Sequence, residues 1–155
     1  MRQTSDLVIY ALKFLPDRAW IVSYSIDIDT PNHLVISKCW NEHSSEEFLT
    51  YLDEIEALGP FDMPYQLLVV MHDDVKLTLD TETVRLAARR NEVFSKSADR
   101  VVVAPDSLGF GLGKVYSLSS KGVSDKYSIV KNLEEGCAVL HVDPVVVRKS
   151  LGSDW

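Results

Sequence analysis

The sequence has few cysteines and no long hydrophobic run. Cys39 and Cys137 are the only cysteines among 155 residues, and neither has a CxxC partner, so a disulfide framework and a zinc site are both excluded. The apolar stretch at residues 7–15 is interrupted by Lys13 and is followed by no small-residue cleavage site. No apolar run approaches the roughly 18 residues of a membrane helix. We therefore expect a reduced, cytoplasmic protein with no integral membrane segment.

Positive charge is also scarce. Lysine and arginine number 16 against 23 aspartate and glutamate residues, which gives a formal net charge of −7. Such a surface repels phosphate backbones and anionic lipid headgroups. The densest basic group, Arg85, Arg89 and Arg90, lies on one predicted helix, where i, i+4 spacing is typical of a solvated face. The composition therefore predicts no nucleic-acid partner.

Local catalytic and metal-binding motifs are missing. The chain contains no GxSxG nucleophile elbow, and neither cysteine has an activating signature beside it. Three of its histidines, His33, His43 and His141, do not share the spacing of metal ligands. These absences predict no cofactor, no metal site and no catalytic residues.

Glycine is uncommon, but three glycines stand close together. Gly109, Gly111 and Gly113 precede Lys114, and their spacing fits neither the phosphate loop GxxxxGKS/T nor the dinucleotide motif GxGxxG. Each glycine inside a helix costs about 1 kcal/mol relative to alanine. We therefore expect them to narrow their helix against the sheet or against a bound apolar group.

The residues that are present predict strands separated by helices. Residues 19–28 alternate apolar and polar side chains, and after a turn residues 33–40 are predicted as the returning strand of a hairpin. Residues 66–71 form the continuous apolar run of a central strand. Ser44 with Glu47 and Asn132 with Glu135 are capping pairs at helix starts. The predicted strands are residues 19–28, 33–40, 66–71, 101–103 and 126–131, and the predicted helices start near residues 45, 80, 106 and 133.

This order of elements predicts one α/β domain over residues 1–155. We expect a mixed sheet of four or five strands with helices mainly on one face. The core spans residues 18–142, residues 1–17 form an N-terminal extension, and residues 143–155 form a tail that packs on a neighbour or on the sheet. On the hairpin, Trp20, Tyr24 and Trp40 either belong to the core or form an exposed aromatic surface.

One segment resembles a known family. A valine-rich strand is followed by Ala-Pro-Asp at residues 104–106 and by Phe-Gly-Leu at residues 110–112, and Asn-Leu-Glu-Glu at residues 132–135 opens the last predicted helix. Over residues 18–142 the chain resembles the STAS-like superfamily, and within it the small stand-alone relatives of bacterial sporulation anti-sigma-factor antagonists (SpoIIAA-like proteins). The resemblance implies a STAS-like fold and a non-enzymatic regulatory or protein-interaction module.

The resemblance also implies a partner or switch surface. Classical members carry Asp-Ser-Ser-Gly at the start of the helix after the central strand, where a serine is phosphorylated. The corresponding residues here are Asp80, Thr81, Glu82 and Thr83. Asp80 matches and Thr81 offers a hydroxyl, but Glu82 replaces the serine and the glycine is missing. Glu82 either imitates a permanently charged state or, with its neighbours, is simply favourable in a first helical turn.

Polar side chains follow two predicted strands, where ligands tend to bind in α/β sheets. His72, Asp73 and Asp74 follow one strand, and Asp106 and Ser107 follow another. A histidine beside carboxylates suits acid–base chemistry, and grouped aspartates suit a hydrated divalent cation. The alternative is that the aspartates cap turns and helices. With Phe110 and Gly111, these residues are the candidate ligand pocket.

Three functions remain open from the sequence. The first is an interaction module for a protein partner, including its own homodimer. The second is a small carrier that holds an apolar or lipid-like ligand between helices and sheet near residues 108–116. The third is a metal-assisted or acid–base enzyme at the strand ends.

Overall fold

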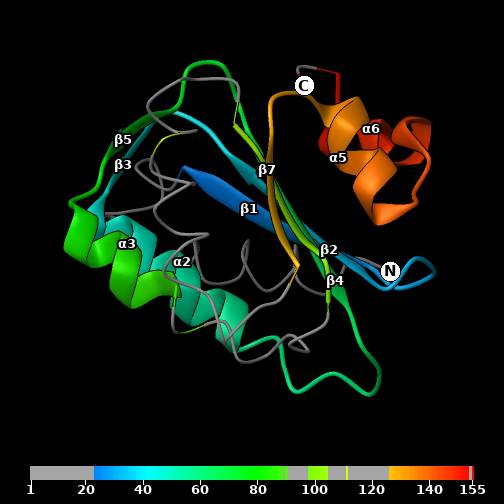
Figure 1. Cartoon of the computed structure of the whole chain (residues 1–155), viewed down its shortest axis with the longest axis horizontal. Coiled ribbons are helices and arrows are strands. Elements are labelled where there is room, and N and C mark those ends of the chain that lie inside the picture. The colour runs from blue at the N-terminus through cyan, green and yellow to red at the C-terminus, as the bar shows by residue number, and fades with distance from the viewer. Residues whose placement is uncertain (1–22, 89, 91–97, 105–110, 112–125, 154) are drawn as a thin grey trace.

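The computed structural model describes residues 23–88, 90, 98–104, 111, 126–153 and 155. In these residues a mixed five-stranded sheet has the order β1-β2-β4-β6-β7 (Figure 1). Its first two strands are antiparallel and the remaining neighbours are parallel. The predicted α/β class, mixed sheet and initial hairpin are confirmed. The strands are β1 (Tyr24–Asp29), β2 (Leu34–Cys39), β4 (Gln66–Met71), β6 (Arg100–Val103) and β7 (Tyr127–Val130).

The central strands are buried on both faces. In β2, Leu34 and Ile36 belong to one apolar cluster while Val35 belongs to the other. In β4, Leu68 and Val69 divide between the two clusters in the same way. Because parallel strands in the middle of a sheet need cover on both sides, this burial requires a helical layer over each face.

Two described helices lie over each face of the sheet. One face is covered by α2 (Ser45–Glu56) and α3 (Thr81–Ala88), and the other by α5 (Leu133–Leu140) and α6 (Pro144–Leu151) (Figure 1). This corrects the expectation of helices mainly on one face. The continuous apolar run of β4 already contained the information, since a strand buried on both sides is apolar at every position.

The segment predicted as a tail forms α6. Asp143 caps the helix by accepting a hydrogen bond from the Val145 backbone N–H at 2.9 Å, and Pro144 occupies the first helical turn. Aspartate followed by proline is a strong start signal, but the three β-branched valines after it obscured the helical period. Val147 and Leu151, one turn apart, are buried against the sheet.

A second small sheet was not predicted. Its strands β3 (Glu42–Ser44) and β5 (Lys76–Thr78) pair in parallel and lie just beyond the ends of β2 and β4. Three residues are too few to show a period of two. The two strands lead directly into α2 and α3, and the Thr78 hydroxyl donates to the His43 carbonyl at 3.1 Å. The starts of both helices are therefore placed by the same small sheet.

Helix α5 lies close to the sheet at Gly136. A Cβ atom at this position would lie 3.2 Å from methyl groups of both Val101 and Val103. Gly111 differs, because it is helical and exposed, and a Cβ there would meet no atom within 4 Å. Close packing therefore explains Gly136 but not Gly111. The rest of the predicted helix at residues 106–116 lies outside the described residues.

Candidate functional site

The carboxyl ends of β2 and β4 bring a histidine and two tryptophans together. Cys39 and Met71 are partners in the parallel register, so Trp40 and His72, which follow them, leave the sheet side by side. The ring of Trp155 makes edge contacts with both, at 5.0 Å between ring centroids for His72 and 6.3 Å for Trp40. Trp40 is thus half-buried beside Trp155, whereas Tyr24 belongs to the core and Trp20 lies outside the described residues.

Among the candidate pocket residues that the structure describes, His72 and Asp74 are joined by a contact. His72 Nδ1 lies 3.1 Å from Asp74 Oδ1, and the same oxygen accepts a hydrogen bond from the Asn41 backbone N–H at 3.0 Å. The Asn41 N–H, and after it His72, lowers the pKa of Asp74. Asp73 is exposed. The hydrogen bond from Asn41 to Asp74 joins the loop after β2 to the loop after β4.

The remaining pocket candidates do not extend this pair. Asp106, Ser107 and Phe110 lie outside the described residues, and Gly111 is exposed. In the part of the chain that the structure describes, no group of three histidine, cysteine or acidic side chains could hold a metal ion. Of the candidate pocket residues, the described part of the chain therefore brings only His72 and Asp74 into contact.

The predicted switch residues lie at the first turn of α3. Asp80 caps the helix by accepting from the Thr83 backbone N–H at 2.6 Å, and this bond lowers the pKa of Asp80. Thr83 is buried, with 7% of its surface exposed. Thr81 and Glu82 are exposed. The structure thus separates the four residues into an anchor, Asp80 and Thr83, and a solvent-facing pair, Thr81 and Glu82.

An apolar side chain follows this pair along α3. Leu86, one turn after Glu82, has 54% of its surface exposed, while Val84 and Ala87 on the opposite side are buried. Arg85 is also exposed. We call Thr81, Glu82, Arg85 and Leu86 the α3 face. The sequence pointed to its first turn but not to Leu86, since an exposed leucine is not apparent from periodicity alone.

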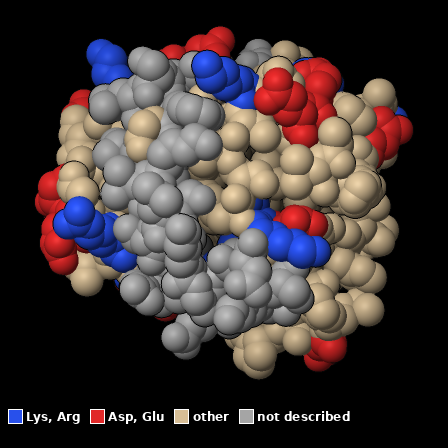
Figure 2. All heavy atoms as spheres, viewed as in Figure 1, with Lys and Arg blue, Asp and Glu red and all other residues tan. Residues whose placement is uncertain are grey.

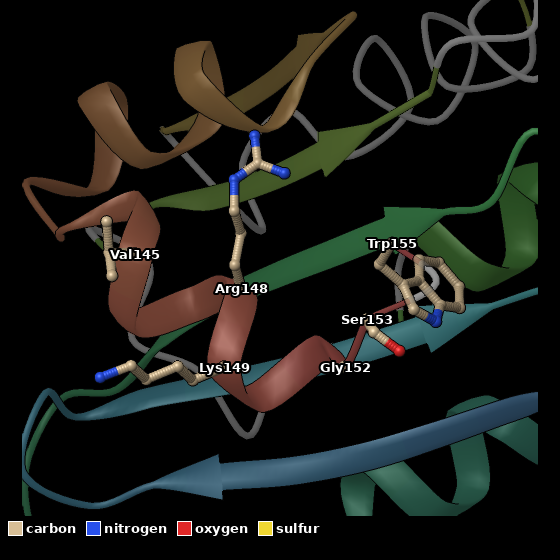
Figure 3. Close-up of a pocket in the computed structure, with 6 residues that line it drawn as sticks. All are labelled: Val145, Arg148, Lys149, Gly152, Ser153 and Trp155. Atoms are coloured by element: carbon tan, nitrogen blue, oxygen red, sulfur yellow. The ribbon is translucent and has the colours of Figure 1, made fainter.

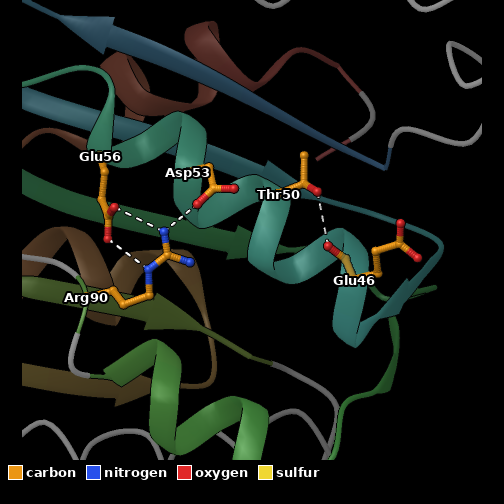
Figure 4. Close-up of polar contacts among 5 residues, drawn as sticks. All are labelled: Glu46, Thr50, Asp53, Glu56 and Arg90. Carbon is orange, nitrogen blue, oxygen red and sulfur yellow. Dashed lines mark hydrogen bonds and ion pairs between the residues drawn. The ribbon is translucent and has the colours of Figure 1, made fainter.

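Arg90, just after the end of α3, joins this part of the chain to α2. Its guanidinium donates to both carboxylate oxygens of Glu56, each at 3.1 Å, and also pairs with Asp53, both on α2 (Figure 4). The hydrogen bond to Asp53, and after it that to Glu56, raises the pKa of Arg90. Figure 4 also shows the Thr50 hydroxyl donating to the Glu46 carbonyl within α2 at 3.1 Å. Arg90 therefore joins two helices and is not part of a free basic patch.

The opposite side of the sheet carries an open pocket that the sequence did not indicate. It has a volume of about 450 Å³ and follows the outer side of α6 to Trp155 (Figure 3). Four lining residues, from residue 145 to residue 152, have the spacing i, i+3, i+4, i+7 and therefore share one side of a helix. The sequence did not show this grouping because residues 143–155 were not recognised as a helix. We call the six lining residues the α6 pocket: Val145, Arg148, Lys149, Gly152, Ser153 and Trp155.

Charged side chains do not form a broad basic region on the face shown in Figure 2, where both signs are interspersed among the described residues. This agrees with the net charge of −7. None of the described helices is long and apolar enough to cross a membrane. The search against known proteins found no matching family model, curated protein or solved structure.

Proposed function

We propose that the protein is a non-enzymatic interaction module that docks a protein partner on the α3 face. The observation that carries the proposal is Leu86, whose side chain is 54% exposed on a helix that is otherwise held firmly to the core. An exposed leucine beside charged residues on a helical face costs solubility in isolation and gains contact area in a complex.

The surroundings of Leu86 support this assignment. Glu82 and Arg85 flank it with one charge of each sign, and Thr81 presents a hydroxyl at the first turn. The Asp80 cap and the Arg90 ion pairs hold the helix from both ends. A face that is rigid before binding loses little conformational entropy when a partner docks. Glu82, at a helix start, has the charge that the helix dipole favours.

The resemblance to STAS-like proteins leads to the same surface. The helix after the central strand begins with an aspartate cap, and the following turn faces solvent, where a charge on residue 82 can be read by a partner. We also propose that the chain is related to the STAS-like proteins, that its role is regulatory and that it acts in the cytoplasm. A permanent carboxylate at residue 82 means that binding does not depend on phosphorylation of that residue.

Partner capture with matched surface variants tests the proposal. Tagged protein is expressed in its native host, and co-purifying proteins are compared among wild type, Glu82→Lys, Leu86→Asp and Met63→Asp. Met63 is a suitable control because it is also apolar and exposed, at 46%, but lies outside helix α3. We expect Glu82→Lys and Leu86→Asp to lose partners that Met63→Asp retains, with melting temperatures close to wild type. Retention of the same partners by all variants would contradict the α3 face as the docking site.

A further inference from the structure

The α6 pocket combines positive charge with exposed apolar surface in an acidic protein. Of the six lining residues in the described part of the chain, Arg148 and Lys149 are cationic and none is acidic. The two cations differ, because Arg148 is paired with Glu134 of α5, whereas Lys149 is exposed and has no carboxylate within 4.0 Å in the described part of the chain. Lys149 is therefore the cation available to a ligand.

Apolar side chains lie next to this lysine. Val145, which lines the pocket, is 58% exposed, and its neighbour Val146 is 40% exposed. Figure 3 shows Val145 and Lys149 at one end of the pocket and Ser153 and Trp155 at the other. A ligand lying along the pocket would thus contact Val145 and Lys149 at one end and the Trp155 ring at the other.

The pocket is held in place by the sheet beneath it. Val147 and Leu151, on the inner side of α6, are 1% and 2% exposed. Lys38 of β2 donates to the Leu151 carbonyl at 3.0 Å and lies over the Trp155 ring, 5.7 Å from its centroid. These contacts fix both the end of the helix and the aromatic wall before any ligand binds.

We propose that the α6 pocket binds an acidic segment of a partner protein in which a carboxylate lies next to an apolar side chain. The apolar side chain packs on Val145 and Val146, and a carboxylate pairs with Lys149. The open shape favours a peptide, since small-molecule sites bury most of their ligand's surface. Because α6 and α3 cover opposite faces of the sheet, this site is independent of the α3 face.

Fluorescence anisotropy with labelled synthetic peptides tests the site on the full chain. The probe is a peptide of glutamates and leucines. Two matched peptides replace either every glutamate by lysine or every leucine by serine. We expect only the glutamate–leucine peptide to bind at physiological salt. Lys149→Glu and Val145→Asp should each weaken binding by at least about tenfold, whereas Lys76→Glu, an exposed lysine on β5, makes the same charge change away from the pocket.

Several results would overturn this assignment. They are absence of binding, equal binding of the lysine peptide, and equal loss in Lys149→Glu and Lys76→Glu. Equal binding of the serine peptide would also overturn it, since an anion site needs no apolar side chain. Melting curves show whether each variant is folded. If Val145→Asp does not fold, the result for Lys149→Glu decides whether the pocket binds the peptide. Glu82→Lys should bind the peptide like wild type, which separates this site from the α3 face.

Discussion

The two faces of the sheet are built from different chemistry. The side covered by α5 and α6 has a core of leucine, isoleucine and valine with one cysteine, Cys137. The side covered by α2 and α3 buries three tyrosines, Tyr24, Tyr51 and Tyr65, and the fully buried Ser37 contributes to the same side. The buried core of one face therefore consists of apolar side chains, whereas the core of the other also contains hydrogen-bonded hydroxyl groups.

The two faces should therefore tolerate different kinds of substitution. An aliphatic core responds chiefly to volume, since its atoms have no hydrogen bonds to lose. A core with buried hydroxyl and carboxyl groups responds to the loss of a partner and to pH. Sensitivity to polar changes is thus concentrated beneath α2 and α3, the helices that present the proposed docking face.

The largest expected effect comes from adding volume where α5 approaches the sheet. Gly136→Val places a Cβ atom 3.2 Å from Val101 and Val103 and adds two methyl groups beyond it. We expect the free energy of unfolding to fall by about 1–3 kcal/mol through overpacking, although valine favours a helix more than glycine does. Urea denaturation measures this change.

The exposed Ala138 on the same helix supplies the matched control. Ala138→Val introduces the same side chain into solvent and should cost only about 0.5 kcal/mol through helix propensity. Equal losses in the two variants would show that α5 does not approach the sheet as closely as described.

A smaller effect is expected from removing one hydroxyl on the other face. Tyr51 donates to Ser37 Oγ at 2.8 Å, and Ser37 is fully buried. Tyr51→Phe should lower the unfolding free energy by about 0.5–1.5 kcal/mol because the hydrogen bond to Ser37 is lost. The double variant Tyr51→Phe/Ser37→Ala should recover part of this loss, since neither polar group then remains. Thermal unfolding of both variants is the measurement, and a double variant less stable than Tyr51→Phe contradicts the pairing.

The smallest effect is a pH dependence from Glu54 on α2. Burial raises its pKa above the ordinary value of 4.5, more than the hydrogen bond with Tyr24 lowers it. The folded state therefore keeps this proton to higher pH than the unfolded chain does. Stability from this group is fully present below pH 4.5 and is lost as pH rises through the elevated pKa.

Glu54→Gln removes this dependence. Its stability relative to wild type should increase as pH rises from about 4.5 toward 8, as measured by urea unfolding at steps of pH. Glu42→Gln, at an exposed position, controls for the loss of one negative charge. If Glu54→Gln and Glu42→Gln differ from wild type by the same amount at every pH, the buried carboxyl is not responsible.

The sequence was sufficient for the elements whose signals are local. Capping pairs at Ser44 and Asn132 correctly placed the starts of α2 and α5, and alternation placed the hairpin. The distribution of helices between the two faces was predicted wrongly, although the continuous apolar run of β4 indicates cover on both sides. Helix α6 was missed because consecutive valines also fit a strand.

The candidate site was predicted only in part for the same reason. Adjacent residues such as His72 and Asp74 could be grouped from the sequence, whereas the contact of His72 with Trp155 joins residues far apart in the chain. Exposure of Leu86 depends on which side of α3 packs on the core, where Val84 and Ala87 are buried. Such tertiary contacts have no local sequence signature.

Site-specific photocrosslinking in the native host tests the central claim most directly. A photoreactive amino acid is placed at residue 86 on α3 and, in a matched protein, at residue 138 on α5, both exposed. We expect a discrete crosslinked species for residue 86 that is absent for residue 138 and is lost when Glu82→Lys is added. No species at residue 86, or the same species from both positions, would contradict a docking site on the α3 face.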